Sequence, residues 1–230
     1  MDDSSWSYRR KLILAPMVRV NSLPFRTLCA EYGCEMLYSE EIVARCLVES
    51  KRSENAALGT IDFTSPDDRG GGRVTFRTRP GEKVVLQLGT ACAVEALQAA
   101  NCAVADVRAI DLNMGCPVKF SVQGGMGSAL LTEPEKVRDI LTTLRRNLPS
   151  TTPVTAKIRL LDNFHDTLQL AKLIEGCGVQ ALAVHARRKH DRPRHWAQVR
   201  RTIPASPHAR AQAAHDTIRS VTNHMQIQTV

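Results

Sequence analysis

The chain has 230 residues, of which 43% are hydrophobic and 23% charged, enough apolar side chains to form a sizeable core without disulfides or metal. No apolar run approaches the ~20 residues of a membrane span, and the acidic start of the chain, with Asp2 and Asp3, is unlike a signal peptide. Seven cysteines without a CxxC pair are typical of a reducing compartment. We therefore expect a cytoplasmic protein with no metal site and no membrane contact.

The positive charge is concentrated in the second half of the chain. Residues 1–115 hold 14 Lys and Arg against 15 Asp and Glu, whereas residues 116–230 hold 17 against 8. Clustered cations favour a polyanionic partner such as RNA, because binding releases counterions from the phosphate backbone. A solvated basic surface has the same composition, so charge alone leaves both interpretations open.

Short apolar runs alternate with amphipathic stretches along the chain, which is the pattern of parallel βα units. The runs predict strands at residues 11–15, 35–38, 83–88, 108–112, 154–158 and 179–184. The amphipathic stretches predict helices at about 22–32, 41–50, 90–103, 132–147 and 163–176. Thr90 and either Asp162 or Asn163 are expected as N-caps, and Thr132 with Glu135 as a capping box.

Two further segments depart from this alternation. Residues 51–82 are expected to form an inserted hairpin, with strands at 61–64 and 73–78. At the other end, residues 216–224 are expected to be helical and 225–230 to begin a seventh strand. We accordingly divide the chain into residues 1–200, the N-terminal part of the main domain, and residues 201–230, an atypical tail.

The ends of the predicted strands are polar and distinguish between two α/β architectures. In a TIM (β/α)8 barrel, all carboxyl ends of the strands converge on one pocket, whereas an open doubly wound sheet places them along a line. No GxGxxG follows any strand. We favour an incomplete TIM barrel of six to seven βα units, with these polar strand-end residues in its pocket: Gln87, Asn113, Lys157, Arg159, His185 and Arg187.

Residues 111–127, DLNMGCPVKFSVQGGMG, are the segment richest in chemistry. Cys116 lies just after a strand, and Pro117 restricts the turn that follows. A thiol with a reference pKa of ~8.5 is mostly protonated near neutral pH and can act as a general acid. The glycines at 124, 125 and 127 predict a mobile loop. A buried structural cysteine is the alternative, which we accept for the other six cysteines.

Together these motifs resemble the tRNA-dihydrouridine synthases, in particular the eukaryotic branch that modifies position 20. The resemblance covers about residues 10–200, with the motifs in the family's order. DLNMGCP followed by GGMG is the most specific pair. The matching segments are 14–18 (LAPMV), 87–90 (QLGT), 111–117 (DLNMGCP), 124–131 (GGMGSALL), 157–159 (KIR) and 184–187 (VHAR).

The resemblance implies an FMN enzyme that reduces the C5–C6 double bond of a D-loop uridine, with NADPH as the source of electrons. It implies that Cys116 donates a proton to C5, and that Asn113, Arg159 and Arg187 contact the uracil or the ring edge. A second set is implied to line the flavin, from the first loop and from three strand ends: Pro16, Met17, Val18, Gln87, Lys157 and His185.

The basic run 187–201 contains seven Lys and Arg and one acid, and is expected to contact tRNA phosphates. The glycine-rich backbone that holds the FMN phosphate in the family has no counterpart in these 230 residues, nor has the family's helical tRNA-binding domain. Two alternatives therefore stay open. One is a different FMN barrel oxidoreductase acting on a free pyrimidine or an enone, and the other is an inactive RNA-binding remnant.

Overall fold

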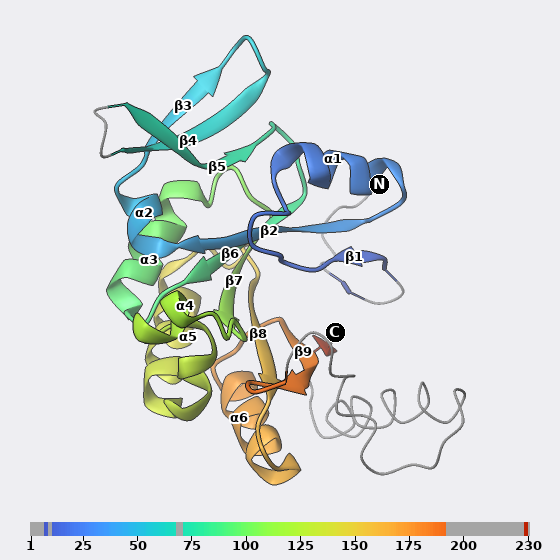
Figure 1. Cartoon of the computed structure of the whole chain (residues 1–230), viewed down its shortest axis with the longest axis vertical. Coiled ribbons are helices and arrows are strands. Elements are labelled where there is room, and N and C mark those ends of the chain that lie inside the picture. Colours follow the sequence, from blue (N-terminus) through green and yellow to red (C-terminus); the bar gives the residue numbers. More distant parts are fainter. Residues whose placement is uncertain (1–6, 9–10, 68–70, 192–227, 230) are drawn as a thin grey trace.

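A computed structural model describes residues 7–8, 11–67, 71–191 and 228–229. Its centre is a parallel sheet with strand order β1-β2-β6-β7-β8-β9-β10 (Figure 1). The six predicted strands are present, and the described part of the tail pairs with β9 as a seventh. The bounds are β1 (Ile13–Leu14), β2 (Met36–Val43), β6 (Val84–Gly89), β7 (Ala109–Met114), β8 (Val154–Leu160), β9 (Ala181–Arg188) and β10 (Gln228–Thr229). The helix predicted at 216–224 and the boundary at residue 200 lie outside the described residues.

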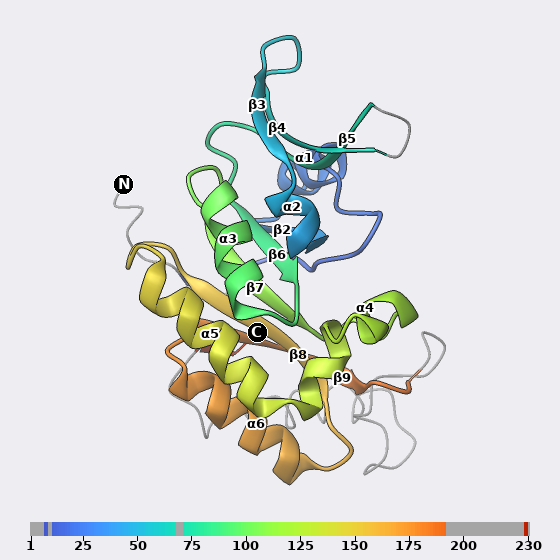
Figure 2. The same ribbon diagram turned by 90° about the vertical axis from the view of Figure 1, so that its left-hand side faces the viewer.

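Three helices, α3, α5 and α6, cover one face of the sheet, as Figure 2 shows, whereas α4 lies at the carboxyl ends of the strands. Alternate side chains of the central strands pack against these helices, and the opposite face carries the polar residues of the strand ends. A sheet with helices on one face only is a curled, barrel-type arrangement, because a doubly wound sheet has helices on both. The helix bounds are α1 (Leu23–Glu31), α2 (Ala44–Val48), α3 (Ala93–Ala103), α4 (Lys119–Gln123), α5 (Pro134–Asn147) and α6 (Phe164–Gly176).

Helix starts differ from the predicted caps at two places. The capping box of Thr132 and Glu135 was wrong: α5 begins at Pro134, with Glu133 as N-cap and no side-chain cap. Proline fits the first helical turn because its missing N–H would have no helical partner there. The N-cap of α3 is Cys92 rather than Thr90, whose hydroxyl instead accepts a hydrogen bond from the Cys92 N–H. Of the two predicted candidates, Asn163 and not Asp162 caps α6, accepting from the Asp166 N–H at 2.8 Å.

The insertion at 51–82 is a three-stranded antiparallel sheet at one end of the molecule (Figure 1). The predicted hairpin corresponds to β4 (Thr60–Pro66) and β5 (Gly72–Thr78), and β3 (Lys51–Asn55) was missed. The KRSEN sequence of β3 has no apolar alternation because nearly all of it is exposed. Arg26 of α1 is 2% exposed and holds the insertion through Glu82, at 2.7 Å.

Within the residues that the structure describes, no helix combines the length and the apolar character needed to cross a bilayer.

Candidate active site

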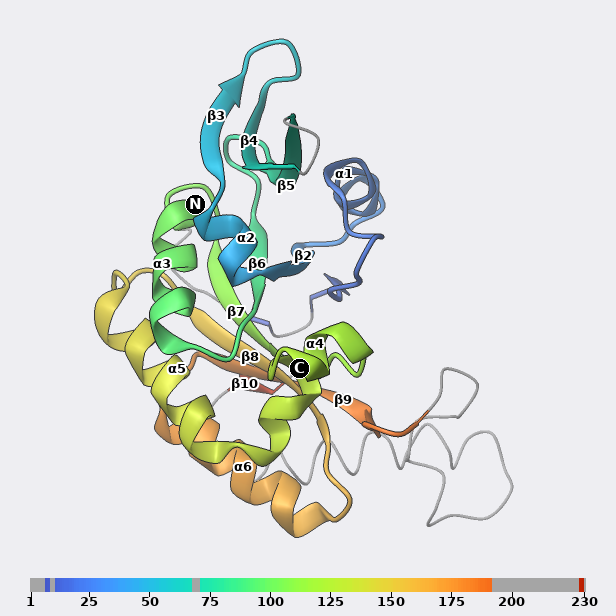
Figure 3. The ribbon, with the colours of Figure 1, turned by 60° about the vertical axis from the view of Figure 1, so that its left-hand side comes forward.

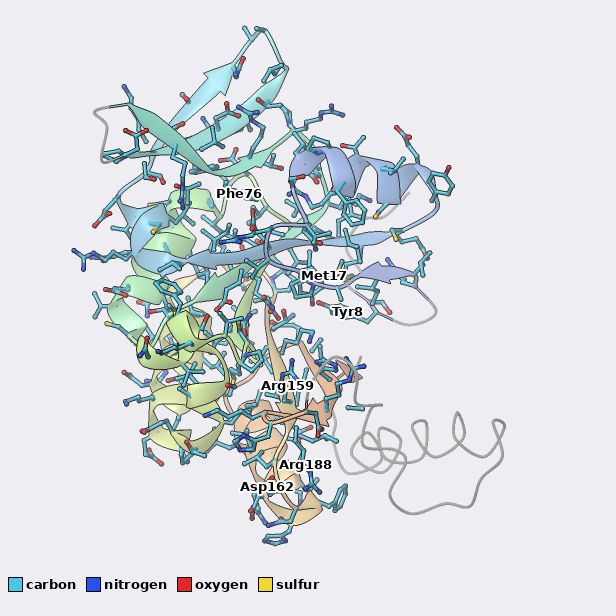
Figure 4. The ribbon with its side chains drawn as sticks, in the orientation of Figure 1. Tyr8, Met17, Phe76, Arg159, Asp162 and Arg188 are labelled. Atoms are coloured by element: carbon cyan, nitrogen blue, oxygen red, sulfur yellow. The ribbon has the colours of Figure 1, made fainter. Side chains whose placement is uncertain are left out.

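A cavity of about 580 Å³ lies at the carboxyl ends of the strands. Every predicted site residue except Arg187 lines this cavity. Met17 lines it from the loop after β1, and Arg159 lines it from the end of β8 (Figure 4). Met17 and Val18 are 40% and 49% exposed, so this side of the cavity presents an open apolar surface. The predicted members are Pro16, Met17, Val18, Gln87, Asn113, Cys116, Lys157, Arg159 and His185.

A chain of buried side-chain hydrogen bonds runs under the cavity from β8 to the end of β7. Thr155 Oγ1 donates to Asp111 Oδ1 at 2.6 Å, and Gln87 Nε2 donates to Asp111 Oδ2 at 2.8 Å. Asn113 Nδ2 then donates to Gln87 Oε1 at 2.8 Å. Finally, Asn113 Oδ1 accepts from the backbone N–H groups of Gly115 and Cys116, both at 2.9 Å.

This chain has a fixed direction because the Asp111 carboxylate can only accept hydrogen bonds. Gln87 must therefore turn its Nε2 toward Asp111 and its Oε1 toward Asn113. Asn113 in turn must present its Oδ1 to the turn that carries Cys116. Asn113 and Gln87 line the cavity, so their contacts with the substrate and the flavin stay predictions, and within the protein both residues also hold the Cys116 turn in place.

Cys116 is half-buried and lies just after β7, as its place after a predicted strand indicated. The glycine-containing segment after it is structured: α4 follows next to the end of β7 (Figure 3), and a 3-10 helix spans Gly127–Thr132. Burial, with Glu41 nearby, raises the pKa of the Cys116 thiol above its usual value. At neutral pH the sulfur therefore carries its proton, as a general acid requires.

Basic side chains gather at the ends of β8 and β9. Burial, followed by the neighbouring cations, lowers the pKa of Arg159, and burial lowers that of Lys157. The Nε of Arg187 is buried and has no hydrogen-bond partner among the described residues. Lys157 also lies within electrostatic reach of Asp111, which opposes the lowering of its pKa. This concentration of positive charge suits an anionic ligand.

His185 is expected to be neutral at physiological pH. Burial and then the charges of Lys157, Arg159 and Arg187 lower its pKa from 6.5 to about 4. Because the folded-state pKa is depressed, the unfolded chain binds more protons below pH 6.5, and stability is lost as the pH falls toward 4. The difference in unfolding free energy between the parent and His185→Gln should therefore shift by roughly 1–3 kcal/mol over this window, measured by urea denaturation. An unchanged difference would contradict the neutral histidine.

The sequence interpretation missed three polar or charged residues that lie in the cavity wall or beneath it. Tyr38 and Glu41 line the cavity from β2, and Asp111 lies beneath it, fully buried. The hydroxyl groups of Tyr38 and Tyr8 form a buried hydrogen bond of 2.7 Å. Asp111 stood in the DLNMGCP motif, and a carboxylate inside an apolar strand was the signal that could have identified it. Nothing in the local sequence distinguished Glu41 from Glu40.

Comparison with known proteins matches residues 13–227 to a family model described as dihydrouridine synthase (Dus). The chain is 41% identical over 195 residues to tRNA-dihydrouridine(20) synthase [NAD(P)+] of Saccharomyces cerevisiae, covering 82% of this chain and 51% of that protein. It is 39% identical over 188 residues to the Schizosaccharomyces pombe protein of the same name, covering 79% and 39%. Against tRNA-dihydrouridine synthase B of Pectobacterium carotovorum it is 35% identical over 181 residues, covering 77% and 50%. The chain spans about half the length, or less, of these relatives.

Proposed function

The chain belongs to the dihydrouridine synthase family, and on that premise we propose that it reduces the C5–C6 double bond of a uridine in the D-loop of tRNA, at position 20. Its fold is the TIM barrel of that family, with the six predicted strands and the described part of a seventh in one curled sheet. The observation that carries the proposal is the cavity at the strand ends, which gathers Cys116, Lys157 and His185 beside an apolar wall.

The residues of the cavity fit FMN as the cofactor. Its apolar side, with Met17 and Val18, suits a flat ring, and Lys157 supplies positive charge for an electron-rich edge. Arg187 does not line the cavity, but its positive charge acts on Arg159 and His185, which do. When bound, FMN supplies the hydride that the C6 atom of the uracil receives. We propose NADPH as the source of electrons.

The chain's own residues then have three tasks. Lys157 holds the cofactor edge and stabilises negative charge there. Asn113 fixes the turn that points Cys116 into the cavity. The Cys116 thiol delivers its proton to C5 of the uracil, which has to be turned out of the RNA fold to reach so enclosed a site. Arg159 and Arg187 are proposed to contact the uracil or the ring edge. With free cysteines at all seven positions, the cytoplasm is the proposed location.

The decisive experiment supplies the purified protein with FMN and NADPH and compares unmodified tRNA with free uridine. Dihydrouridine in tRNA alone, detected by mass spectrometry of nucleosides, is the expected result. Equal reduction of free uridine would favour an FMN oxidoreductase of small pyrimidines or enones. RNA binding without flavin binding or product would identify an inactive RNA-binding remnant.

The basic run 187–201 is proposed to supply non-specific affinity for tRNA through phosphate contacts. Most of this run lies outside the described residues, so the argument rests on its charge. Replacing Arg192, Arg194, Arg200 and Arg201 with Ala should flatten the dependence of log affinity on log salt by up to ~3–4 units, if each neutralises one phosphate. Filter binding at several salt concentrations measures this slope. A slope equal to that of the parent protein would show that the run is only solvated.

A further inference from the structure

A carboxylate that the proposed reaction does not use lies beside the sulfur of Cys116. Glu41, on β2, lines the same cavity. Ser121, on α4, bridges the two: its Oγ is 3.4 Å from Cys116 Sγ and 3.4 Å from Glu41 Oε2. Ser121 is only 4% exposed, so the bridging hydroxyl is shielded from water. Three separate elements of the fold thus bring together a thiol, a hydroxyl and a carboxylate.

The backbone of β2 is irregular in the way that directs Glu41 into the cavity. Tyr38 pairs with Val85 and Glu41 pairs with Gln87, so three steps along β2 match two steps along β6. In a regular strand, residues 38 and 41 would point to opposite faces of the sheet. The bulge between them turns both side chains into the cavity.

Two glycines, which have no side chain, make room for the group formed by Glu41, Ser121 and Cys116. A Cβ at Gly89 would lie 2.5 Å from Glu41 Oε1. A Cβ at Gly127 would lie 2.6 Å from the carbonyl oxygen of Cys116 and 3.2 Å from Ser121 Cβ, and its φ of +61° also favours glycine. The glycines of the QLGT and GGMG motifs therefore allow Glu41 and Ser121 to close around Cys116.

We propose that Glu41 is a positioning residue whose own charge keeps the Cys116 sulfur protonated and which, through Ser121, holds that sulfur toward the cavity. The inference rests on the proposed function, in which Cys116 donates the proton to C5. Because a carboxylate only accepts hydrogen bonds, the Ser121 hydroxyl donates to Glu41 and leaves its lone pairs for the thiol S–H. If Cys116 ionised, its negative charge would face that of Glu41, and Ser121 would have to donate to the sulfur instead.

The groups around Cys116 act on its ionisation in opposite directions. Burial and the carboxylate of Glu41 raise the pKa of the thiol, whereas the Ser121 hydroxyl and the backbone N–H of Val118 lower it. From β8, the Arg159 cation also attracts the thiolate form. Glu41 is thus the nearby charge that counteracts a basic pocket, which would otherwise favour a thiolate unable to donate a proton. The remaining titratable side chains that line the cavity are Tyr38, Lys157 and His185.

The test is the pH dependence of alkylation at Cys116, which needs neither flavin nor activity. Iodoacetamide reacts with the thiolate, and mass spectrometry of the peptide containing Cys116 isolates this site from the other six cysteines. In Glu41→Gln, the midpoint of the profile should fall by about one pH unit, because the like charge is gone. The alkaline limb of dihydrouridine formation should shift down by the same amount, with the KM for tRNA unchanged.

Two further variants make the test specific. Glu40→Gln removes the neighbouring carboxylate, whose Oε2 accepts from the Arg19 N–H at 2.9 Å, and should leave the midpoint unchanged. Ser121→Ala should raise the midpoint, because the thiolate loses a donor, and it provides an independent test if Glu41→Gln fails to fold. Unshifted midpoints in both the Glu41 and Ser121 variants would overturn the inference alone. Full activity of Cys116→Ala would instead overturn the proposed function.

Discussion

Cys116→Ala is expected to lower the rate of dihydrouridine formation in tRNA by ~10²–10⁴-fold, while NADPH continues to reduce the bound flavin at its normal rate. The thiol is the group on the cavity wall that is both kept protonated by its surroundings and held by a dedicated turn. Its loss removes the proton that C5 has to receive. It leaves the apolar wall and Lys157, which serve the cofactor, in place. The substitution should therefore block the reduction of tRNA without slowing the reduction of the flavin by NADPH.

The measurement pairs anaerobic reduction, followed by the loss of flavin absorbance, with tRNA turnover. Cys92→Ala is the matched control, since Cys92 is exposed and lies outside the cavity. It should retain both half-reactions. Parent-like turnover of tRNA in Cys116→Ala would remove this thiol from the mechanism, and slowed flavin reduction would mean that the substitution disturbs the cofactor site.

The cavity could be predicted from the sequence because parallel strands bring their carboxyl ends together. Knowing that Gln87, Lys157 and His185 follow three such strands was sufficient to place them in one pocket. The alternation of strands and helices could not predict which groups each side chain contacts. The contact of Asn113 with the substrate stays a prediction, whereas the hydrogen bonds of its amide with Gln87 and with the backbone of the Cys116 turn could not be foreseen.

Glu41 shows why part of the site could not be predicted. Strand alternation places residues 38 and 41 on opposite faces, and only the bulge, which depends on pairing with β6, brings both into the cavity. Pairing between β2 and β6 joins segments separated by the whole insertion, so no local signal records it. β3 was missed for a different reason: its residues are polar and almost all exposed, so no apolar alternation marks a strand that forms by pairing with β4.

The insertion and the barrel each contain a buried carboxylate, and the two are stabilised in different ways. In the insertion, Arg77 pairs with Asp62 and lowers the pKa of that carboxyl to about 2, a simple ion pair. Beneath the cavity, by contrast, Asp111 is fully buried and forms no ion pair within the described part of the chain; it accepts hydrogen bonds from Gln87 and Thr155. Burial raises its pKa from 3.8 to about 6. Burying the Asp111 carboxylate lowers the stability of the fold. Its role in orienting Gln87 and Asn113 explains why it is nevertheless there.

Asp111→Ala is accordingly expected to lower the free energy of unfolding by ~2–5 kcal/mol, since the donors of Gln87 and Thr155 lose their acceptor in a dry interior. Asp111→Asn nearly keeps the volume and is the sharper variant. Its amide no longer dictates the orientation of Gln87 and Asn113, so the Cys116 turn loosens and tRNA turnover falls more than stability does.

A pH series distinguishes this role from simple packing. Because the pKa of Asp111 is raised in the folded state, the folded protein binds more protons than the unfolded chain between about pH 4 and pH 6. The parent should therefore lose up to roughly 3 kcal/mol relative to Asp111→Asn as the pH rises through this window, with no further change above it. Urea denaturation at each pH gives the difference directly. A difference that does not vary with pH would show that Asp111 ionises as easily in the fold as outside it, and the account of a buried carboxylate orienting the Cys116 turn would fail.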